Sequence, residues 1–332
     1  MVLILSDNFD PSTSDIINWL DYQGVKWFRI NETDCVRLIN IEIGNNGNSN
    51  VAILVNEEQR IDLRDIDAYW YRRGYLAKAD EWRRARYTDS DFLQSSIYKT
   101  LQDDDQNAFE YLHYFLQDNK RNINSYLSAK NNKLYYLSKA MESGLTVPKS
   151  IVCTTKVELL NFYNNNAGKI ICKSINEGFF SKSNNYQYFS LTNLVQLSDI
   201  ESSSETFFPS LFQEYIEKFI ELRIFYFHEK VYSMAIFSQL NEKTKIDIKN
   251  FDENLPNREV PFCLPSGIIQ KITRFMKRIK LNSGSLDMII TPANEYYFLE
   301  VNPVGQFGNV SRSCNYEIEK LLAEYLKTGN EK

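Results

Sequence analysis

Two oxygen-bearing side chains near the end of a predicted strand have the types and the spacing of metal ligands. Residues 296–301 are rich in aromatic and β-branched side chains, and Pro303 lies two residues after them, which predicts a strand that ends at the proline. Because side chains alternate along a strand, Glu300 and Asn302 should share one face, whereas Leu299 and Val301 should point into the core. A carboxylate and an amide oxygen side by side suit Mg²⁺, a hard ion that takes oxygen ligands.

A third oxygen ligand is expected on the preceding strand. Residues 284–290 predict that strand, and Asp287 lies within it. On this evidence alone, an exposed strand end without a ligand would explain Glu300 and Asn302 equally well. The cations in the rest of the chain decide between the two interpretations.

The composition excludes several classes of protein. A chain of 332 residues is expected to form two or three domains, and its hydrophobic content of 43% is ample for their cores. The net charge of −5 argues against a nucleic-acid partner, since phosphate binding needs a basic field. No apolar run approaches the ~20 residues that span a bilayer, and the first residues lack the basic region of a signal peptide. We therefore expect neither a nucleic-acid nor a membrane partner.

The cysteines and histidines narrow the chemistry further. The five cysteines are widely spaced and form no Cys-x-x-Cys pair, which indicates a reduced, cytoplasmic setting. His113 and His228 are the only histidines. A histidine-rich zinc site or a Ser-His-Asp triad is therefore not expected.

Residues 1–124 are predicted to form an N-terminal α/β domain. A strand at residues 2–5 precedes an amphipathic helix from about Thr13, and residues 45–48 predict a turn between two strands.

Later in this domain, residues 68–74 predict a strand with a basic end. Arg72 and Arg73 at that end suit an anionic ligand or a peptide, or else a solvated strand end. A helical pattern over residues 88–119 predicts six inward positions: Phe92, Ile97, Leu101, Ala108, Leu112 and Phe115.

The central part of the chain, residues 125–206, is predicted to form a second unit. A helix opens near Lys133, and Thr155 begins a capping box for another helix. Residues 169–174 predict a buried strand that brings Lys173 to its edge. Residues 174–185 are polar and pliable, and they fit either a loop that closes over a ligand or an ordinary hairpin turn.

The last unit is predicted over residues 207–332. Strands followed by isolated helices, in no regular βαβ rhythm, indicate an α+β arrangement. The predicted elements are strands at 211–216, 220–227 and 231–237, a helix at 266–280, the two strands that carry the oxygen ligands, and a closing helix at 314–327.

The candidate residues follow a distinctive order along the chain. They are Lys133, Lys173, Gln213-Glu214-Tyr215-Ile216, Glu221-Leu222-Arg223, Asp287 and Glu300-x-Asn302. This order resembles the ATP-grasp superfamily of carboxylate-amine ligases, and the resemblance covers nearly the whole chain. The segments 281–287 and 298–308, with 71–74 and 236–239, are similar to ATP-grasp peptide maturases of the grasp-with-spasm type, relatives of the microviridin ligases that make graspetides.

The resemblance implies an ATP-grasp fold, in which an N-terminal α/β pre-ATP-grasp domain precedes two α+β subdomains that clasp ATP. Lys133 and Lys173 would neutralise the ATP phosphates, although each would also fit as a solvated lysine. Gln213 would lie on the hinge strand, and backbone groups of Glu214, Tyr215 and Ile216 would bind adenine. A plain core strand would show the same pattern.

The remaining roles concern the ribose, the transferred phosphoryl group and the metal. Glu221 would bind the ribose hydroxyls, with a surface salt bridge as its alternative. Arg223 would face the γ-phosphate or an acyl-phosphate, with an ordinary ion pair as its alternative. Asp287, Glu300 and Asn302 would hold one or two Mg²⁺ ions.

One segment departs from the family pattern. Residues 246–249 fall where many relatives carry Asp-x-Arg, and here Lys249 keeps the charge but loses the bidentate fork. Either Lys249 acts as a point charge or Arg258 shares its work, so the catalytic cation is left open among Arg223, Lys249 and Arg258, together with Lys173.

The function implied by the resemblance is ligation on a ribosomally made precursor peptide. Asp or Glu side chains would be activated as acyl-phosphates and joined to Thr or Ser hydroxyls or Lys amines. The family also implies a leader segment on the precursor, a homodimer, and a radical-SAM (SPASM) protein in the same pathway. Three alternatives remain: a ligase of free amino acids or a protein tail, similar to glutathione synthetase, a nucleotide- or peptide-binding module without turnover, and a phosphotransferase such as an inositol-phosphate kinase.

Overall fold

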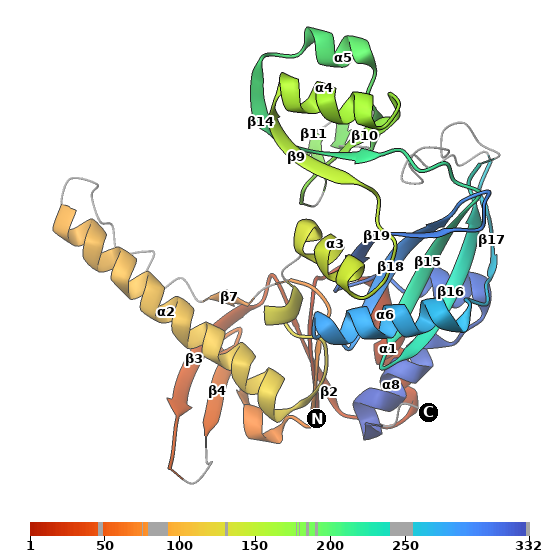
Figure 1. Cartoon of the computed structure of the whole chain (residues 1–332). Helices are drawn as coiled ribbons and strands as arrows, with labels where there is room; N and C mark the ends of the chain where they lie inside the picture. The colour runs from red at the N-terminus through yellow and green to blue at the C-terminus, as the bar shows by residue number, and fades with distance from the viewer. Residues whose placement is uncertain are drawn as a thin grey trace. The chain divides into compact units, whose positions relative to one another are not determined.

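The computed structural model divides into two compact units, Met1–Lys130 with Glu317–Lys332, and Asn131–Tyr316 (Figure 1). The C-terminal segment, which the sequence groups with residues 207–316, thus belongs to the same unit as the N-terminal residues. The structure describes residues 1–45, 49–74, 76–78, 92–129, 132–176, 178, 180–183, 186–189, 192–239 and 255–329.

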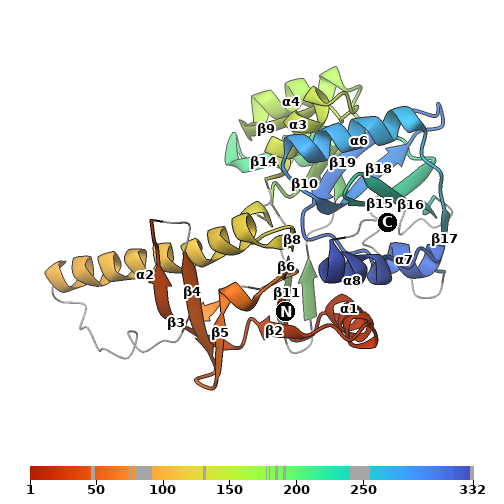
Figure 2. The ribbon, with the colours of Figure 1, turned by 90° about the horizontal axis from the view of Figure 1, so that it is seen from below.

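The first unit is built on a parallel sheet of order β2-β1-β6-β8, of which β2, β6 and β8 are labelled in Figure 2. Its strands are Val2–Ser6 (β1), Trp27–Asn31 (β2), Ala68–Tyr71 (β6) and Arg121–Ile123 (β8). Every residue of β1 and β6 is buried, as expected for a parallel sheet that is covered on both faces. Helices α1 (Pro11–Tyr22) and α8 (Ile318–Thr328) pack against each other, and α8 also contacts β6 and β8.

Helix α1 begins two residues earlier than the periodicity indicates. Asp10 is its N-cap, because the carboxylate accepts a hydrogen bond of 2.9 Å from the amide of Thr13. Pro11 occupies the first turn, where its missing N–H costs nothing.

The first unit also contains a smaller sheet of order β5-β4-β3-β7 and a long helix, α2 (Phe92–Asn119). The strands are Cys35–Glu42 (β3), Asn50–Val55 (β4), Gln59–Asp62 (β5) and Ala77–Lys78 (β7), and single 3₁₀ turns lie at Leu63–Asp65 (η1) and Leu127–Ala129 (η2). The predicted turn at residues 45–48 lies largely outside the described residues.

Only the second half of α2 has the predicted inward face. Leu112 and Phe115 are buried and Ala108 is half-buried, but Ile97 and Leu101 are 50% and 48% exposed, so their assignment as inward positions was wrong. The periodic stripe continues along the helix beyond the part that packs on the unit, and periodicity alone cannot show where that packing ends. The side chain of Phe92 is outside the described residues.

The second unit contains an antiparallel sheet of order β13-β10-β14-β9. Its strands are Ser150–Thr155 (β9), Ile170–Lys173 (β10), Asn193–Leu194 (β13) and Thr206–Glu214 (β14), and its helices are α4 (Lys156–Asn165) and α5 (Leu197–Ser202). Thr155 is the N-cap of α4, as predicted, since its hydroxyl accepts from the amide of Glu158. The reciprocal contact of the predicted capping box differs, because the Glu158 carboxylate accepts from the Thr155 hydroxyl and not from its backbone amide. Strands β11 (Phe180–Ser183) and β12 (Tyr186–Phe189) pair as an antiparallel hairpin, one of the two structures considered for this segment.

The larger sheet of the second unit is antiparallel, with order β17-β16-β15-β18-β19. Its strands are Ile220–Phe227 (β15), Lys230–Phe237 (β16), Arg258–Pro261 (β17), Ser283–Ile290 (β18) and Tyr296–Asn302 (β19). Helices α3 (Lys133–Glu142) and α6 (Ser266–Arg278) cover one face. The core there includes Leu222, Ile224, Met288, Phe298 and Phe275, which leaves the opposite face for a site.

The predicted closing helix at 314–327 is interrupted in the structure. Helix α7 (Gly308–Cys314) ends at Asn315, and α8 starts after Glu317. Both residues have left-handed backbone angles, with φ of 55° and 50°, which a continuous right-handed helix does not allow.

Candidate functional site

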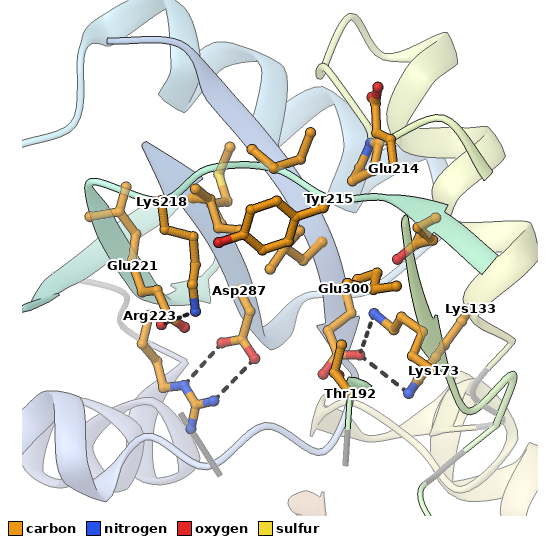
Figure 3. A pocket seen from close by; sticks show the side chains of 18 of the residues that line it. Lys133, Lys173, Thr192, Glu214, Tyr215, Lys218, Glu221, Arg223, Asp287 and Glu300 are labelled. Carbon is orange, nitrogen blue, oxygen red and sulfur yellow. Dashed lines mark hydrogen bonds and ion pairs between the residues drawn. The ribbon is translucent and has the colours of Figure 1, made fainter. Parts of the chain in front are cut away.

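A single row of charged side chains crosses three strands of the larger sheet. Arg223 of β15 pairs with Asp287 of β18, which in turn pairs with Glu300 of β19. All three line one cavity of the second unit (Figure 3). The alternation of each strand sends their neighbours Leu222 and Met288 into the opposite core. The two strands predicted to carry oxygen ligands are therefore adjacent, and their carboxylates lie side by side.

A β-bulge gives Glu300 its place in this row. Asp287 pairs with Glu300 but the next residue of β18 pairs with Phe298, so Leu299 is the extra residue. Without the bulge, Glu300 would share the face of Phe298, which is fully buried in the core. Leu299 itself lines the cavity. Its predicted place in the core was wrong, because the bulge breaks the alternation on which that prediction rested.

Two lysines reach the Glu300 carboxylate from other elements. Lys133 stands at the first position of α3, after the N-cap Asn132, and its Nζ lies 3.3 Å from Glu300 Oε2. Lys173 ends β10, and its Nζ lies 3.7 Å from the same oxygen. The lysine side chains are only 11% and 14% exposed, so two cations converge on one acidic oxygen in a largely desolvated place (Figure 3).

Arg223 and Asp287 form a bidentate pair beside these lysines. Nε and one terminal nitrogen of Arg223 each donate a hydrogen bond of 3.0 Å to an oxygen of Asp287. The charge of Asp287 is the main reason why the pKa of Arg223 is raised, and Glu300 and Glu221 contribute less. The guanidinium therefore stays charged at the cavity surface, where its side chain is 29% exposed.

The segment that joins β14 to β15 forms another wall of the cavity. Gln213, Glu214, Tyr215 and Ile216 all line it. The amides of Glu214 and Tyr215 donate to the carbonyls of Lys149 and Lys169. Within the described part of the chain, no hydrogen bond is found for the amide of Ile216. This amide is therefore available to a ligand.

The side chains of Gln213 and Glu214 point to structural partners. The Gln213 amide donates to the Ser150 hydroxyl at 2.8 Å, and one Glu214 oxygen accepts from the Lys149 amide at 2.9 Å. Any contact of these two residues with a base would thus come from the backbone.

A second carboxylate, Glu221, lies two residues before Arg223 on the same cavity face of β15. Its Oε1 accepts from Lys218 Nζ at 2.6 Å and from the Ser238 hydroxyl at 2.5 Å. Glu221 is a residue that the sequence predicts for the site, whereas its partners Lys218 and Ser238 were not predicted. Lys218 lies three positions before Glu221, and this spacing could have indicated the pair. A lysine at a predicted hinge is normally expected to be solvated, but the Lys218 side chain is only 4% exposed.

The donor set fits a magnesium ion. Asp287 and Glu300 offer carboxylate oxygens from paired strand positions in the cavity. Asn302 stands two residues beyond Glu300 on the exposed end of β19 and is not among the residues that line the cavity. Among the described residues, no cluster of three or more His, Cys, Asp or Glu side chains is suited to a metal. Mg²⁺ needs none, because it is commonly held by one or two carboxylates together with substrate phosphates and water.

The loop after β19 is held tightly against β18. A Cβ on Gly305 would overlap Ser285, whose hydroxyl donates a hydrogen bond of 2.9 Å to the Gln306 carbonyl. Asn302 pairs with Ser285 across the strands, and its Oδ1 accepts from the Val304 amide. The glycine thus allows a close approach that fixes the strand end carrying Asn302.

Two of the candidate cations are not part of this arrangement as described. Lys249, with Ile246 to Ile248, lies outside the described residues. Arg258 is on β17, where its guanidinium lies 5.8 Å from the centre of the Phe237 ring, and it does not line the cavity. Of the cations considered for catalysis, the described cavity brings together Arg223 and Lys173, with Lys133 beside them.

Comparisons with known proteins identify the fold. The family model of the MvdD pre-ATP grasp domain matches residues 1–106. The macrocyclase MdnC from Microcystis aeruginosa MRC, solved with its precursor peptide MdnA, is 24% identical over 99% of this chain and 100% of its own, with a TM-score of 0.74. A RiPP-associated ATP-grasp ligase from Chryseobacterium gregarium, solved with ADP and a leader and core peptide, is 24% identical over 99% of this chain and 97% of its own, with a TM-score of 0.80.

A more distant match is the D-cycloserine synthetase DcsG, 13% identical over 98% of this chain and 100% of its own, with a TM-score of 0.54. No curated protein matches the chain. The predicted fold class is confirmed: the chain has a mixed α/β ATP-grasp fold with a pre-ATP-grasp domain. Within the described residues, no helix has both the length and the apolar character needed to cross a membrane.

Proposed function

We propose that the protein is an ATP- and Mg²⁺-dependent ligase, which activates a carboxylate as an acyl-phosphate and passes the acyl group to an alcohol or an amine. The observation that supports this best is the charged row of Arg223, Asp287 and Glu300, which meets Lys133 and Lys173 in one cavity. A cavity that combines paired acids with several cations suits a polyanion that arrives together with a divalent ion.

The nucleotide would lie between the hinge and the lysines. The amide of Ile216 would donate to adenine, Glu221 would accept from the ribose, and Lys133 and Lys173 would leave Glu300 to bind phosphates. Asp287, Glu300 and Asn302 would hold Mg²⁺, which supplies neutralisation of phosphate charge when it is bound.

The remaining cations would reduce the repulsion between the substrate carboxylate and the anionic nucleotide. Attack by the substrate carboxylate on the γ-phosphorus gives an acyl-phosphate and ADP, and attack by the acceptor oxygen or nitrogen on the acyl carbon then releases phosphate. Arg223 would face the transferred group, with Lys173 and Lys249 as further cations. Such a reaction depends on positioning and charge stabilisation, so the chain needs no covalent nucleophile.

The substrate we propose is a ribosomal precursor peptide with a leader segment. Asp or Glu side chains would be linked to Thr or Ser as esters or to Lys as amides, closing macrocycles. Support comes from the relatives of similar fold, which were solved with precursor peptides, and from the sequence resemblance. The homodimer, the radical-SAM partner and the cytoplasmic location stay predictions.

The test is to incubate the chain with a candidate precursor peptide encoded beside its gene, with ATP and Mg²⁺, and to follow the peptide by mass spectrometry. Each bond formed should remove the mass of one water, with one ADP released per bond. Hydrolysis or methanolysis would then distinguish esters from amides. Glu300→Ala should abolish the mass loss, and Arg258→Ala, which changes a cation outside the cavity, should keep it.

Other outcomes point to the alternatives. Release of ADP only when free amino acids are supplied would replace the peptide substrate by a small-molecule one. Nucleotide binding without ADP release under any acceptor would favour a binding module. Mass loss that persists in Glu300→Ala would contradict the assignment of the site.

A further inference from the structure

The carboxylate of Glu221 is held through one of its two oxygens. Lys218 Nζ and the Ser238 hydroxyl both donate to Oε1, at 2.6 and 2.5 Å. Gln239 in turn donates to the Ser238 oxygen at 3.2 Å. Among the residues that the structure describes, no hydrogen bond reaches Oε2 of Glu221. Because Glu221 lines the cavity, this second oxygen is the one that a ligand would meet.

Lys218 is an unusual residue to find in this position. Its side chain is 4% exposed and that of Glu221 is 13% exposed, so the pair is largely removed from water. Burying an ammonium group is costly unless it is paired and hydrogen-bonded. A solvated lysine at the hinge would avoid that cost. The buried arrangement therefore has a consequence for Glu221 that a surface pair would lack, namely a carboxylate with one fixed orientation.

Three separate pieces of the chain supply this arrangement. Lys218 belongs to the hinge between β14 and β15, Glu221 to β15, and Ser238 to the residue directly after β16. Glu221 pairs with Ile236 across β15 and β16, which brings Ser238 close to it. The carboxylate is thus fixed by the hinge on one side and by the neighbouring strand on the other (Figure 3 shows the Lys218 contact).

We propose that Lys218 and Ser238 are positioning residues that orient Glu221 for a vicinal diol, and that they thereby set a preference for ribonucleotides over 2′-deoxyribonucleotides. The inference rests on the proposed function, since it requires ATP in this cavity. An oriented carboxylate oxygen can accept from the two neighbouring hydroxyls of a ribose. A 2′-deoxyribose offers one hydroxyl fewer, and hydrogen bonds to a charged group are the stronger ones.

The experiment compares equilibrium binding of ATP, 2′-deoxy-ATP and tripolyphosphate to the full chain by calorimetry, with Mg²⁺ present. We expect the wild-type chain to bind ATP about tenfold or more tightly than 2′-deoxy-ATP, as a charged hydrogen bond predicts. In Lys218→Met the ratio should fall several-fold towards one, and Ser238→Ala should lower it less. Tripolyphosphate has no ribose, so its affinity should be unchanged in both variants.

Lys149→Met is the matched control. Lys149 also pairs with a cavity carboxylate, Glu214, at 3.7 Å, but its side chain is 71% exposed. This variant should keep the wild-type ratio. In Glu221→Gln, the ratio of the affinities for ATP and 2′-deoxy-ATP should fall as far as it does in Lys218→Met.

The results separate this inference from the proposed function. If Lys218→Met kept the wild-type ratio while ATP still bound, the positioning role would be wrong and the nucleotide site would stand. If tripolyphosphate lost as much affinity as ATP, Lys218 would act on phosphates or on the fold, and the inference would also be wrong. A wild-type chain that binds no ATP would overturn both.

Discussion

The two units each contain an arginine–aspartate pair of similar geometry in very different surroundings. In the first unit Arg72 donates to Asp10 with distances of 3.0 and 3.3 Å, and the two side chains are 2% and 4% exposed. In the second unit Arg223 donates to Asp287 at 3.0 Å twice, with side chains 29% and 27% exposed. The first pair is sealed, and the second opens onto a cavity.

The surroundings change how burial and pairing shift the pKa values of these side chains. Burial is the main influence on the pKa of Arg72 and lowers it. Burial also raises the pKa of Asp10, but the Arg72 charge and the hydrogen bonds from Thr13 and Arg72 outweigh it, so that pKa is lowered. For Arg223 the charge of Asp287 comes first, and its pKa is raised.

The comparison separates a structural pair from an exchangeable one. Asp10 also caps α1, so the sealed pair ties the end of β6 to the start of a helix. A pair at a cavity surface can give up its partners to a ligand that supplies equivalent charges. We therefore expect the sealed pair to determine stability and the open pair to determine binding.

The largest expected effect comes from breaking the sealed pair. Arg72→Met should destabilise the first unit by up to about 3–5 kcal/mol, because it leaves the buried Asp10 carboxylate with only the half-exposed Arg73, whose Nε lies 3.8 Å from Asp10 Oδ1. Denaturant unfolding followed by circular dichroism would measure this loss. Arg223→Met is the matched variant and should cost about 1 kcal/mol or less. Equal losses in the two variants would show that burial does not distinguish the pairs.

A pH titration tests a second sealed group of the first unit. His113 is buried and stacks on Tyr126 with ring centres 4.3 Å apart, and burial lowers its pKa to about 4. The unfolded chain takes up this proton near pH 6.5, whereas the folded chain takes it up only near pH 4. The stability contribution is therefore present above pH 6.5 and is lost as the pH falls towards 4, in total on the order of 3 kcal/mol.

The control for this titration is His113→Phe, which keeps an aromatic ring against Tyr126 and removes the titrating group. Unfolding free energies measured between pH 7 and pH 4 should fall more steeply for the wild-type chain than for this variant. Parallel curves would mean that His113 takes up its proton at the same pH in the folded and the unfolded chain. Carboxylates titrate in both proteins and cancel in the difference.

The sequence was sufficient for the fold class and for the residues of the open pair. The strand patterns at residues 284–290 and 296–301 placed Asp287 and Glu300 on neighbouring strands, and the family resemblance supplied Arg223 and the fold. The prediction from alternation was wrong for Leu299. A bulge depends on how two strands pair, and the residue pattern of one strand does not show that pairing. The predicted inward positions Ile97 and Leu101, in the first half of α2, were also wrong. The spacing of apolar residues shows which face of a helix would pack, but it does not show where the packing partner ends.

The partners of Glu221 illustrate a different limit. Lys218 and Ser238 are polar residues of ordinary appearance in the sequence, twenty positions apart. They converge only when the hinge folds back and β15 pairs with β16. Whether a lysine is buried depends on the tertiary structure. From composition and spacing alone, a lysine is expected to be exposed to solvent.

The smallest effect we predict sharpens the role of the open pair. Arg223 donates to both oxygens of Asp287, so a metal ion that binds Asp287 must compete with the arginine. Arg223→Met should therefore raise the affinity for Mg²⁺ alone by about tenfold, or about 1.4 kcal/mol, measured by calorimetry without nucleotide. The same variant should turn over ATP more slowly, because the transferred phosphoryl group loses a cation.

Arg258→Met, which changes an arginine outside the cavity, should leave both quantities at their wild-type values. Unchanged Mg²⁺ affinity in Arg223→Met would mean that Asp287 binds no metal, and Glu300 and Asn302 would remain as the ligands.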